Sequence, residues 1–282
     1  PGIAPAVGVL TNLAPDHLDR YATVEEYYAD KKLLFRNAKT ISRWVVNGDD
    51  RAAVDLAREA VGTHKHFSLK QSHADATYDR ENDMLVVGES PLLPRRELNL
   101  FGDHNVANAL AASLAVMIAD KGNATPEARA RIGDGLRTFH ALKHRLEIAG
   151  ESNGVMWIND SKATNVSSTL VAIQGMTRPT ILLLGGRHKG EPYRALAEPL
   201  RQNGKAVLAY GEAAPIIEQD LRGVVPLERL GSDFEEVIAR ARSLATPGDV
   251  VLLSPACSSY DMFKNYGGRG ATFKRLAVGG RQ

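Results

Sequence analysis

The chain has 282 residues, of which 44% are hydrophobic, 24% charged and 6% aromatic, a composition typical of globular proteins. A formal net charge of +2 gives no basic surface of the kind that nucleic-acid-binding domains carry. No apolar run reaches the ~20 residues that a membrane-spanning helix needs. The single cysteine, Cys257, excludes an internal disulfide and fits a reducing cytoplasm. We therefore expect a cytoplasmic protein that binds neither nucleic acid nor a membrane.

Short apolar runs alternate with helix-length segments in the second half of the chain. The runs at 155–158, 180–184, 206–210 and 249–253 are apolar throughout, which is typical of strands covered by helices on both faces. Segments 164–175, 192–202 and 232–245 have the length of helices. This alternation predicts a doubly wound, mostly parallel sheet with right-handed crossovers.

The first half is less regular. Residues 7–11 and 44–46 indicate strands, and 64–100 contains several short β-like pieces, such as 84–87. A helix is expected after Asp103, which would be its N-cap, and Pro126 suits the first turn of the next helix. The domain boundary is expected near Ala141, which divides the chain into residues 1–141 and 142–282.

Polar or glycine-rich sequences follow three of the predicted strands in the second half, at 159–165, 185–190 and 254–260. In open α/β sheets, ligands bind beyond the carboxyl ends of the strands. One such loop alone is best explained as a solvated helix cap, but three on one edge favour a binding site. The glycines allow close approach of the backbone, and the helix N-termini that follow favour anions.

Each residue in these loops also has a simpler explanation. Asp160 could be only a helix cap, Lys162 a surface lysine and Thr164 a first-turn residue. No histidine partner can be assigned to Cys257 from the sequence, so we interpret it as a small packing residue at a strand end rather than a nucleophile.

Two features of the first half could also bind a ligand. Asn105 and Asn108 stand one helical turn apart, so both can face one ligand, although both could equally cap the helix. Asp16 and His17 follow a predicted strand and could ligate a hard divalent ion. Lys31 lies on a predicted helix that begins near Val24, and by composition alone it is an ordinary exposed lysine.

Six motifs together resemble those of the Mur ligases. They are NLAPDHLDRY at 12–21, FGDHNVANA at 101–109, KHR at 143–145, WINDSKATN at 157–165, LGGRHKG at 184–190 and LSPACSSYDMFKNY at 253–266. The last three are similar to the D-glutamate-adding members of that family. The motifs follow the family's order, and the resemblance extends from residue 12 to 273.

The resemblance implies a fold and a reaction. Residues 1–141 would form the carboxyl-terminal part of a central ATPase domain, and 142–282 a Rossmann-like carboxyl-terminal domain. The reaction would be ATP-dependent ligation of D-glutamate to UDP-N-acetylmuramoyl-L-alanine through an acyl phosphate, in peptidoglycan precursor synthesis. The intact protein would be a monomer.

The resemblance also implies roles for individual residues. His17 and Lys31, the latter carbamylated, would bind Mg²⁺, with Lys32 as the neighbour that could take this role if the alignment slips by one. The nucleotide contacts would be Asn105, Asn108, Arg145, Asp160 and Lys162. The D-glutamate contacts would be Thr164, Lys189, Ser259, Tyr260 and Tyr266. Tyr266 is a departure, because family members often have Phe there.

One family feature is absent from these 282 residues. The Gly-Lys-Ser or Gly-Lys-Thr ending of a phosphate-binding loop does not occur, since the only Gly-Lys pair, Gly204-Lys205, is followed by Ala206. The resemblance implies roughly 150 further residues before Pro1, so we expect the 282 residues alone to be inactive. Two alternatives remain: a non-catalytic nucleotide- or glutamate-binding fragment, and a related Mur or folylpolyglutamate ligase. The 254–266 run argues against the second.

Overall fold

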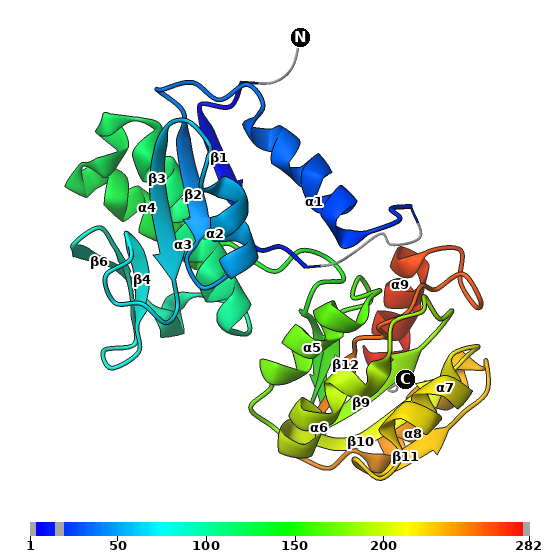
Figure 1. The fold of residues 1–282 in the computed structure, drawn as a ribbon. Helices are drawn as coiled ribbons and strands as arrows, with labels where there is room; N and C mark the ends of the chain where they lie inside the picture. Colours follow the sequence, from blue (N-terminus) through cyan, green and yellow to red (C-terminus); the bar gives the residue numbers. More distant parts are fainter. Residues whose placement is uncertain (1–3, 15–19, 279–282) are drawn as a thin grey trace. The chain divides into compact units, whose positions relative to one another are not determined.

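The computed structural model describes residues 4–14 and 20–278. The chain forms two compact units, residues 1–140 and 141–282 (Figure 1). Within the described ranges, no helix is both long and apolar enough to cross a bilayer.

Unit 1 is built on a six-stranded sheet in the order β1-β2-β3-β4-β5-β6. The first four strands are parallel, and β5 and β6 complete the sheet as antiparallel strands. The strands are β1 (Val7–Leu10), β2 (Arg43–Asn47), β3 (Thr63–Ser68), β4 (Ala76–Asp79), β5 (Met84–Val87) and β6 (Ser90–Pro94). The helices are α1 (Val24–Lys32), α2 (Arg51–Ala57), α3 (Asp103–Ala119) and α4 (Pro126–Thr138), with 3₁₀ turns at Leu33–Phe35, Arg95–Glu97 and Lys121–Ala124.

Both faces of this sheet are covered, because successive side chains of a strand point to opposite faces. Val45 packs with Leu110 of α3, whereas its neighbour Trp44 packs with Ala53 of α2. The strands predicted at 7–11, 44–46 and 84–87 and the first-turn position of Pro126 are confirmed.

The predicted N-cap of α3 is wrong. The helix begins at Asp103 itself, and Gly102, at a φ of 76° that glycine tolerates well, occupies the cap position. The Asp103 carboxylate instead pairs with Arg80, 2.6 Å away.

Unit 2 contains a second six-stranded sheet, in the order β11-β10-β9-β12-β8-β7. All neighbouring strands are parallel except the β7–β8 pair. The strands are β7 (Glu147–Ser152), β8 (Val155–Asn159), β9 (Thr180–Gly185), β10 (Gly204–Tyr210), β11 (Leu227–Arg229) and β12 (Val250–Leu253). The helices are α5 (Val166–Gln174), α6 (Ala197–Asn203), α7 (Ala214–Leu221), α8 (Phe234–Leu244) and α9 (Tyr266–Val278), with a 3₁₀ turn at Tyr193–Leu196.

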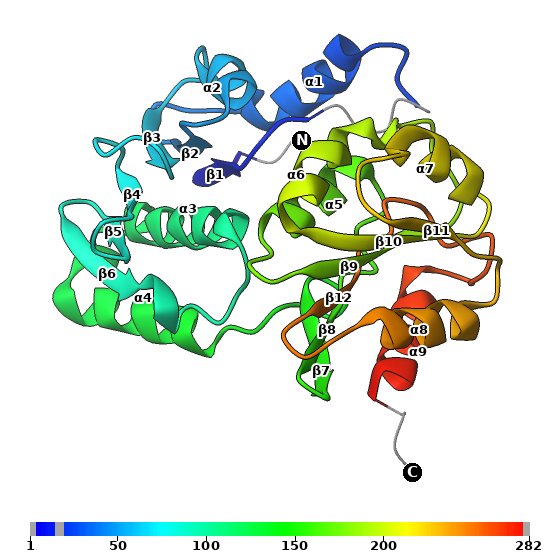
Figure 2. The ribbon, with the colours of Figure 1, turned by 90° about the horizontal axis from the view of Figure 1, so that it is seen from below.

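The helices of unit 2 cover its sheet on both faces. Helices α5, α6 and α7 lie on one side, and α8 and α9 on the other (Figure 2). The side changes because the chain runs outward from β8 to β11 and then returns to insert β12 between β8 and β9, and right-handed crossovers then require the opposite face. The predicted doubly wound α/β fold is confirmed, and the reversal lies at β9 and β12, whose carboxyl ends are the place where sheets of this kind bind ligands.

The edge strands β7 and β11 were not predicted from the sequence. The β7 sequence, EIAGES, lacks the apolar run that a buried strand needs, and β11 has only three residues. Helix α9 was also missed, because it begins with Tyr266-Gly267-Gly268 and glycine disfavours a helix.

Candidate functional site

The three predicted strand-end loops of unit 2 meet at one edge of its sheet. Strand β12 lies between β8 and β9, and main-chain hydrogen bonds join the segments that follow all three. Ala256 N donates to Ala163 O at 2.9 Å and Gly185 N donates to Pro255 O at 3.0 Å. Arg187 and Ser258 exchange a pair of such bonds. The expectation that these loops share an edge is therefore confirmed.

The side chain of Arg269, in α9, lies between the three loops. It is 0% exposed, and its guanidinium donates to the Ser161 hydroxyl and carbonyl at 3.0 and 2.9 Å and to the Cys257 carbonyl at 3.1 Å. Longer contacts reach the carbonyls of Gly185 and Ser258, at 3.4 and 3.5 Å. Each of the three loops thus bonds to the same cation.

Arg269 was not identified from the sequence, although a signal was present. It stands in Gly267-Gly268-Arg269-Gly270, and three glycines in one helical turn cost about 1 kcal/mol each relative to alanine. Such a cost points to close packing. At Gly270 a Cβ atom would lie 2.2 Å from His144 Nδ1.

The Gly185-Gly186 pair is required by the same crowding. A Cβ atom would lie 2.1 Å from the Tyr210 carbonyl at Gly185 and 2.2 Å from the Ser258 carbonyl at Gly186. The glycines therefore let the β9 loop approach the ends of both neighbouring strands.

Asp160, in the loop after β8, is only 7% exposed. Its carboxylate accepts hydrogen bonds from the Ser254 hydroxyl at 2.8 Å and from Leu146 N at 3.2 Å. Burial raises the pKa of Asp160 to about 7, against the opposing effects of these bonds and of the Arg145 charge. Both carboxylate oxygens already have protein partners, so Asp160 is more than the surface helix cap that the sequence also allowed.

Asp160 also supports a strained turn that carries Arg145. His144 and Leu146 have φ values of 65° and 45°, a region that non-glycine residues rarely occupy. The bonds from Leu146 N to Asp160 and from His144 N to Glu147 hold this turn, and the Arg145 side chain is exposed at its tip.

The exposed side chains above this base are mainly cations, hydroxyls and rings. Lys162 Nζ lies 5.6 Å from the centre of the Tyr266 ring, and Tyr266 O accepts a bond from the Ser161 hydroxyl. Among the other predicted contacts of unit 2, Lys189 is exposed, Thr164 half-buried, Tyr260 65% exposed and Ser259 2% exposed. Such an edge can bind a small anion through cations and hydroxyls.

Two predicted nucleotide contacts lie together in unit 1. Asn108 Nδ2 donates to Asn105 Oδ1 at 3.4 Å, and Asn105 Nδ2 donates to the Phe101 carbonyl at 2.8 Å. The two amides therefore share one face of α3, which agrees with their spacing.

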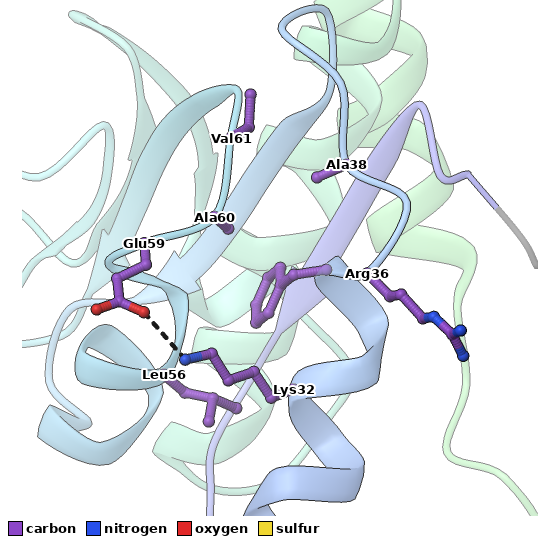
Figure 3. Close-up of a pocket in the computed structure, with 8 residues that line it drawn as sticks. Lys32, Arg36, Ala38, Leu56, Glu59, Ala60 and Val61 are labelled. Atoms are coloured by element: carbon purple, nitrogen blue, oxygen red, sulfur yellow. Dashed lines mark hydrogen bonds and ion pairs between the residues drawn. The ribbon is translucent and has the colours of Figure 1, made fainter.

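Lys31 and Lys32, at the end of α1, point to different surroundings. Lys31 Nζ lies 5.0 Å over the Tyr27 ring, whereas Lys32 Nζ pairs with Glu59 at 3.1 Å (Figure 3). Lys32 also lines a pocket of about 340 Å³ between α1, α2 and the segments that follow them. His17 lies outside the described residues, among which no group of three metal-ligating side chains occurs.

We predict that Asp160 makes the stability of the chain depend on pH. A carboxyl with a raised folded-state pKa stabilises the folded protein below its unfolded value of 3.8, and this contribution is lost as the pH rises towards 7. Asp160→Asn removes the titration but keeps groups that can bond to Ser254 and Leu146. The free energy of unfolding of the variant, minus that of the wild type, should increase by up to about 3 kcal/mol from pH 4 to pH 7 in urea titrations. A difference that stays constant with pH would contradict the assignment.

Comparison with known proteins matches a different family model to each of the two units. Residues 2–116 match the Mur ligase middle domain, and residues 144–257 match the Mur ligase, glutamate ligase domain. A UDP-N-acetylmuramoylalanine–D-glutamate ligase of Acidobacterium capsulatum is 39% identical over 98% of this chain and 60% of its own length. One from Koribacter versatilis is 36% identical over 96% of this chain and 59% of its own length.

A solved structure has a similar fold. The MurF ligase from Thermotoga maritima in complex with ADP has a TM-score of 0.66 at 18% identity, and the match covers 97% of this chain and 61% of that one. The chain spans about 60% of the length of the curated relatives it matches. With both domain models matched in order, the chain belongs to the Mur ligase family.

Proposed function

We propose that this chain supplies the D-glutamate-binding edge and part of the nucleotide-binding surface of an ATP-dependent UDP-N-acetylmuramoyl-L-alanine:D-glutamate ligase in peptidoglycan precursor synthesis. The observation that carries the proposal is the edge of unit 2, where three loops held by one buried cation present the exposed Lys162 and Lys189 beside less exposed hydroxyls. The names of the relatives support this choice of substrates.

The proposed chemistry needs charge stabilisation and positioning, and no covalent bond to the protein. The carboxylate of the acceptor takes the γ-phosphoryl group of ATP and releases ADP. The amine of D-glutamate then attacks the acyl carbon, phosphate leaves, and the nitrogen loses its proton as the amide forms. Fixed cations around phosphate and carboxylate oxygens stabilise the charge that moves in both steps.

The residues of unit 2 suit these tasks. Arg145 and Lys162 are exposed cations that can bind phosphate oxygens. Asp160 has two bonded oxygens, but a carboxylate has about four acceptor sites, so it can still accept a ribose hydroxyl. Lys189 and Ser259 can bind the carboxylates of D-glutamate.

The remaining predicted contacts complete this proposal. Tyr260 follows Ser259 in the β12 loop, Thr164 lies in the β8 loop and Tyr266 begins α9, and all three can contact D-glutamate. Asn105 and Asn108 can bind the nucleotide from unit 1, since their amides share one helix face.

We propose that Mg²⁺ binds at the exposed end of α1. Lys31 is exposed, so its amine is accessible to carbon dioxide, and a carbamate there would provide oxygen ligands, whereas His17 would provide an imidazole nitrogen. Mg²⁺ bound at this position would neutralise charge on the phosphate oxygens. We further propose that the intact protein is a cytoplasmic monomer.

Two other hypotheses compete with this proposal. One is a related ligase that adds another amino acid, and the other is a binding fragment without catalytic activity. A panel of D- and L-amino acids, supplied with ATP and UDP-N-acetylmuramoyl-L-alanine to a full-length ligase that contains this chain, separates them. We expect phosphate release to depend on D-glutamate. Release with another amino acid, or none with any, would overturn the proposed function.

Lys31→Ala in that full-length ligase should abolish nearly all activity, because it removes the proposed carbamate, and small carboxylates should partly restore it. Lys32→Ala is the matched control, since it breaks only the exposed ion pair with Glu59, which is worth at most about 1 kcal/mol. Steady-state phosphate release measures both. Wild-type turnover in Lys31→Ala, or a severe loss in Lys32→Ala alone, would contradict the assignment.

Lys189→Ala should weaken the use of D-glutamate specifically. The lost charge-assisted hydrogen bond is worth about 1.5–3 kcal/mol, which corresponds to a roughly 10- to 150-fold lower kcat/KM for D-glutamate. The KM for ATP serves as the internal control and should change little. A defect that lies mainly in ATP, or unaltered D-glutamate kinetics, would remove Lys189 from this site.

A further inference from the structure

The hydroxyl of Tyr193 connects two loops of the candidate site. Its oxygen lies 3.0 Å from His188 Nδ1 and 2.9 Å from Cys257 Sγ. His188 belongs to the loop after β9 and Cys257 to the loop after β12. Tyr193 is 1% exposed and Cys257 0% exposed, so these bonds are protected from competition with water.

The β9 loop needs such a contact because its backbone is glycine-rich. The main-chain bonds between Arg187 and Ser258 fix the loop on one side of His188. On the other side, Gly190 has a φ of 88°, and a Cβ atom there would meet nothing within 4 Å. Lys189 lies between the bonded Arg187 and the unconstrained Gly190. The hydrogen-bonded ring of His188 is therefore the neighbour that can fix the position of Lys189.

The backbone of Tyr193 is itself fixed by contacts with α7. Its backbone N–H donates to the Asp220 carboxylate of α7 at 2.8 Å, and Arg194 pairs with the same carboxylate at 3.3 Å. The Tyr193 and His188 rings also pack against each other, with centres 5.5 Å apart. The hydroxyl is therefore a fixed point to which the loop can bind.

The proton of the Tyr193 hydroxyl can be given to only one of its two partners. Burial raises the pKa of the Cys257 thiol to about 11 and also raises the pKa of Tyr193, so both are neutral at pH 7. The hydroxyl has one proton, and an imidazole nitrogen accepts it better than a thiol sulfur does. With Nδ1 as the acceptor, the hydroxyl donates to His188 and the thiol donates to the hydroxyl.

We propose that Tyr193 is a positioning residue for D-glutamate: its hydroxyl bonds His188 to Cys257 and so holds Lys189 in place beside the loop that carries Ser259. The role rests on the proposed function, because Lys189 and Ser259 are the proposed carboxylate ligands. The hydrogen bonds that join Cys257, Tyr193 and His188 can be tested without any substrate.

The test compares Tyr193→Phe with the wild type. The variant keeps the ring and removes only the hydroxyl. In the 282-residue chain, we expect the ¹⁵N resonance of His188 Nδ1 to shift and amide exchange at His188 and Lys189 to accelerate. In a full-length ligase that contains this chain, the KM for D-glutamate should rise roughly 3- to 20-fold, the effect of one or two buried hydrogen bonds, with kcat and the KM for ATP within about twofold.

Two controls separate positioning from general damage. Tyr78→Phe makes the same chemical change in unit 1, where the hydroxyl donates to Asp83, and should leave the D-glutamate KM unchanged. Cys257→Ser keeps a partner for the Tyr193 hydroxyl and should behave like the wild type, whereas Cys257→Ala should resemble Tyr193→Phe in part.

The outcomes distinguish the proposal from the proposed function. An unchanged His188 resonance, or a D-glutamate KM that stays at the wild-type value in Tyr193→Phe, would overturn the positioning role. If the wild-type ligase instead used another amino acid, the proposed function would fail. The ¹⁵N shift and the exchange at Lys189 would still decide whether the hydroxyl holds the loop.

Discussion

The candidate site of unit 2 depends on the solvation of one buried guanidinium. Removing a cation from water costs several kcal/mol unless oxygen atoms replace the lost water. The partners of Arg269 within the described residues are carbonyl and hydroxyl oxygens from all three strand-end loops. These loops must therefore turn their carbonyls inward together. Carbonyls at the carboxyl ends of parallel strands already point in this direction, so the fold supplies acceptors where the arginine needs them. In return, the arginine fixes the shape of the loops.

The sequence predicted this edge because its signals are local. Apolar runs mark β8, β9 and β12, and the polar residues that follow them must lie at the carboxyl ends of parallel strands. Arg269 could not be predicted in the same way, because its partners lie 11 to 108 residues away along the chain. The partners of the Asp160 carboxylate, Leu146 and Ser254, are also far from it along the chain, 14 and 94 residues away. No local sequence pattern could therefore predict these contacts. In unit 1 the N-cap of α3 was predicted from the capping preference of aspartate. The prediction failed because Gly102, at a positive φ, occupies the cap position instead.

A rigid base and adjustable side chains explain the division of roles at this edge. Glycines let the backbones approach closely, Arg269 bonds them from below, and the Tyr193 hydroxyl holds the loop just before Lys189. The lysines and hydroxyls proposed to meet substrate stand on this base. The backbone that carries these side chains has few alternative conformations. The flexibility of the side chains therefore reduces the precision of substrate positioning only a little. The strained turn at Arg145 follows the same logic, since Asp160 and Glu147 hold it from within the unit.

The central claim is that the three loops form one structural element around Arg269. Amide hydrogen exchange of the 282-residue chain tests it in Arg269→Met, with Arg269→Lys, which keeps the charge, as the conservative variant. We expect exchange at Ala163, Arg187 and Ser258, one bonded amide in each loop, to accelerate together in the Met variant and less in the Lys variant. Leu182 and Leu252 inside the sheet should keep their protection. Unchanged exchange at the three loop amides, or acceleration at only one of them, would contradict the account.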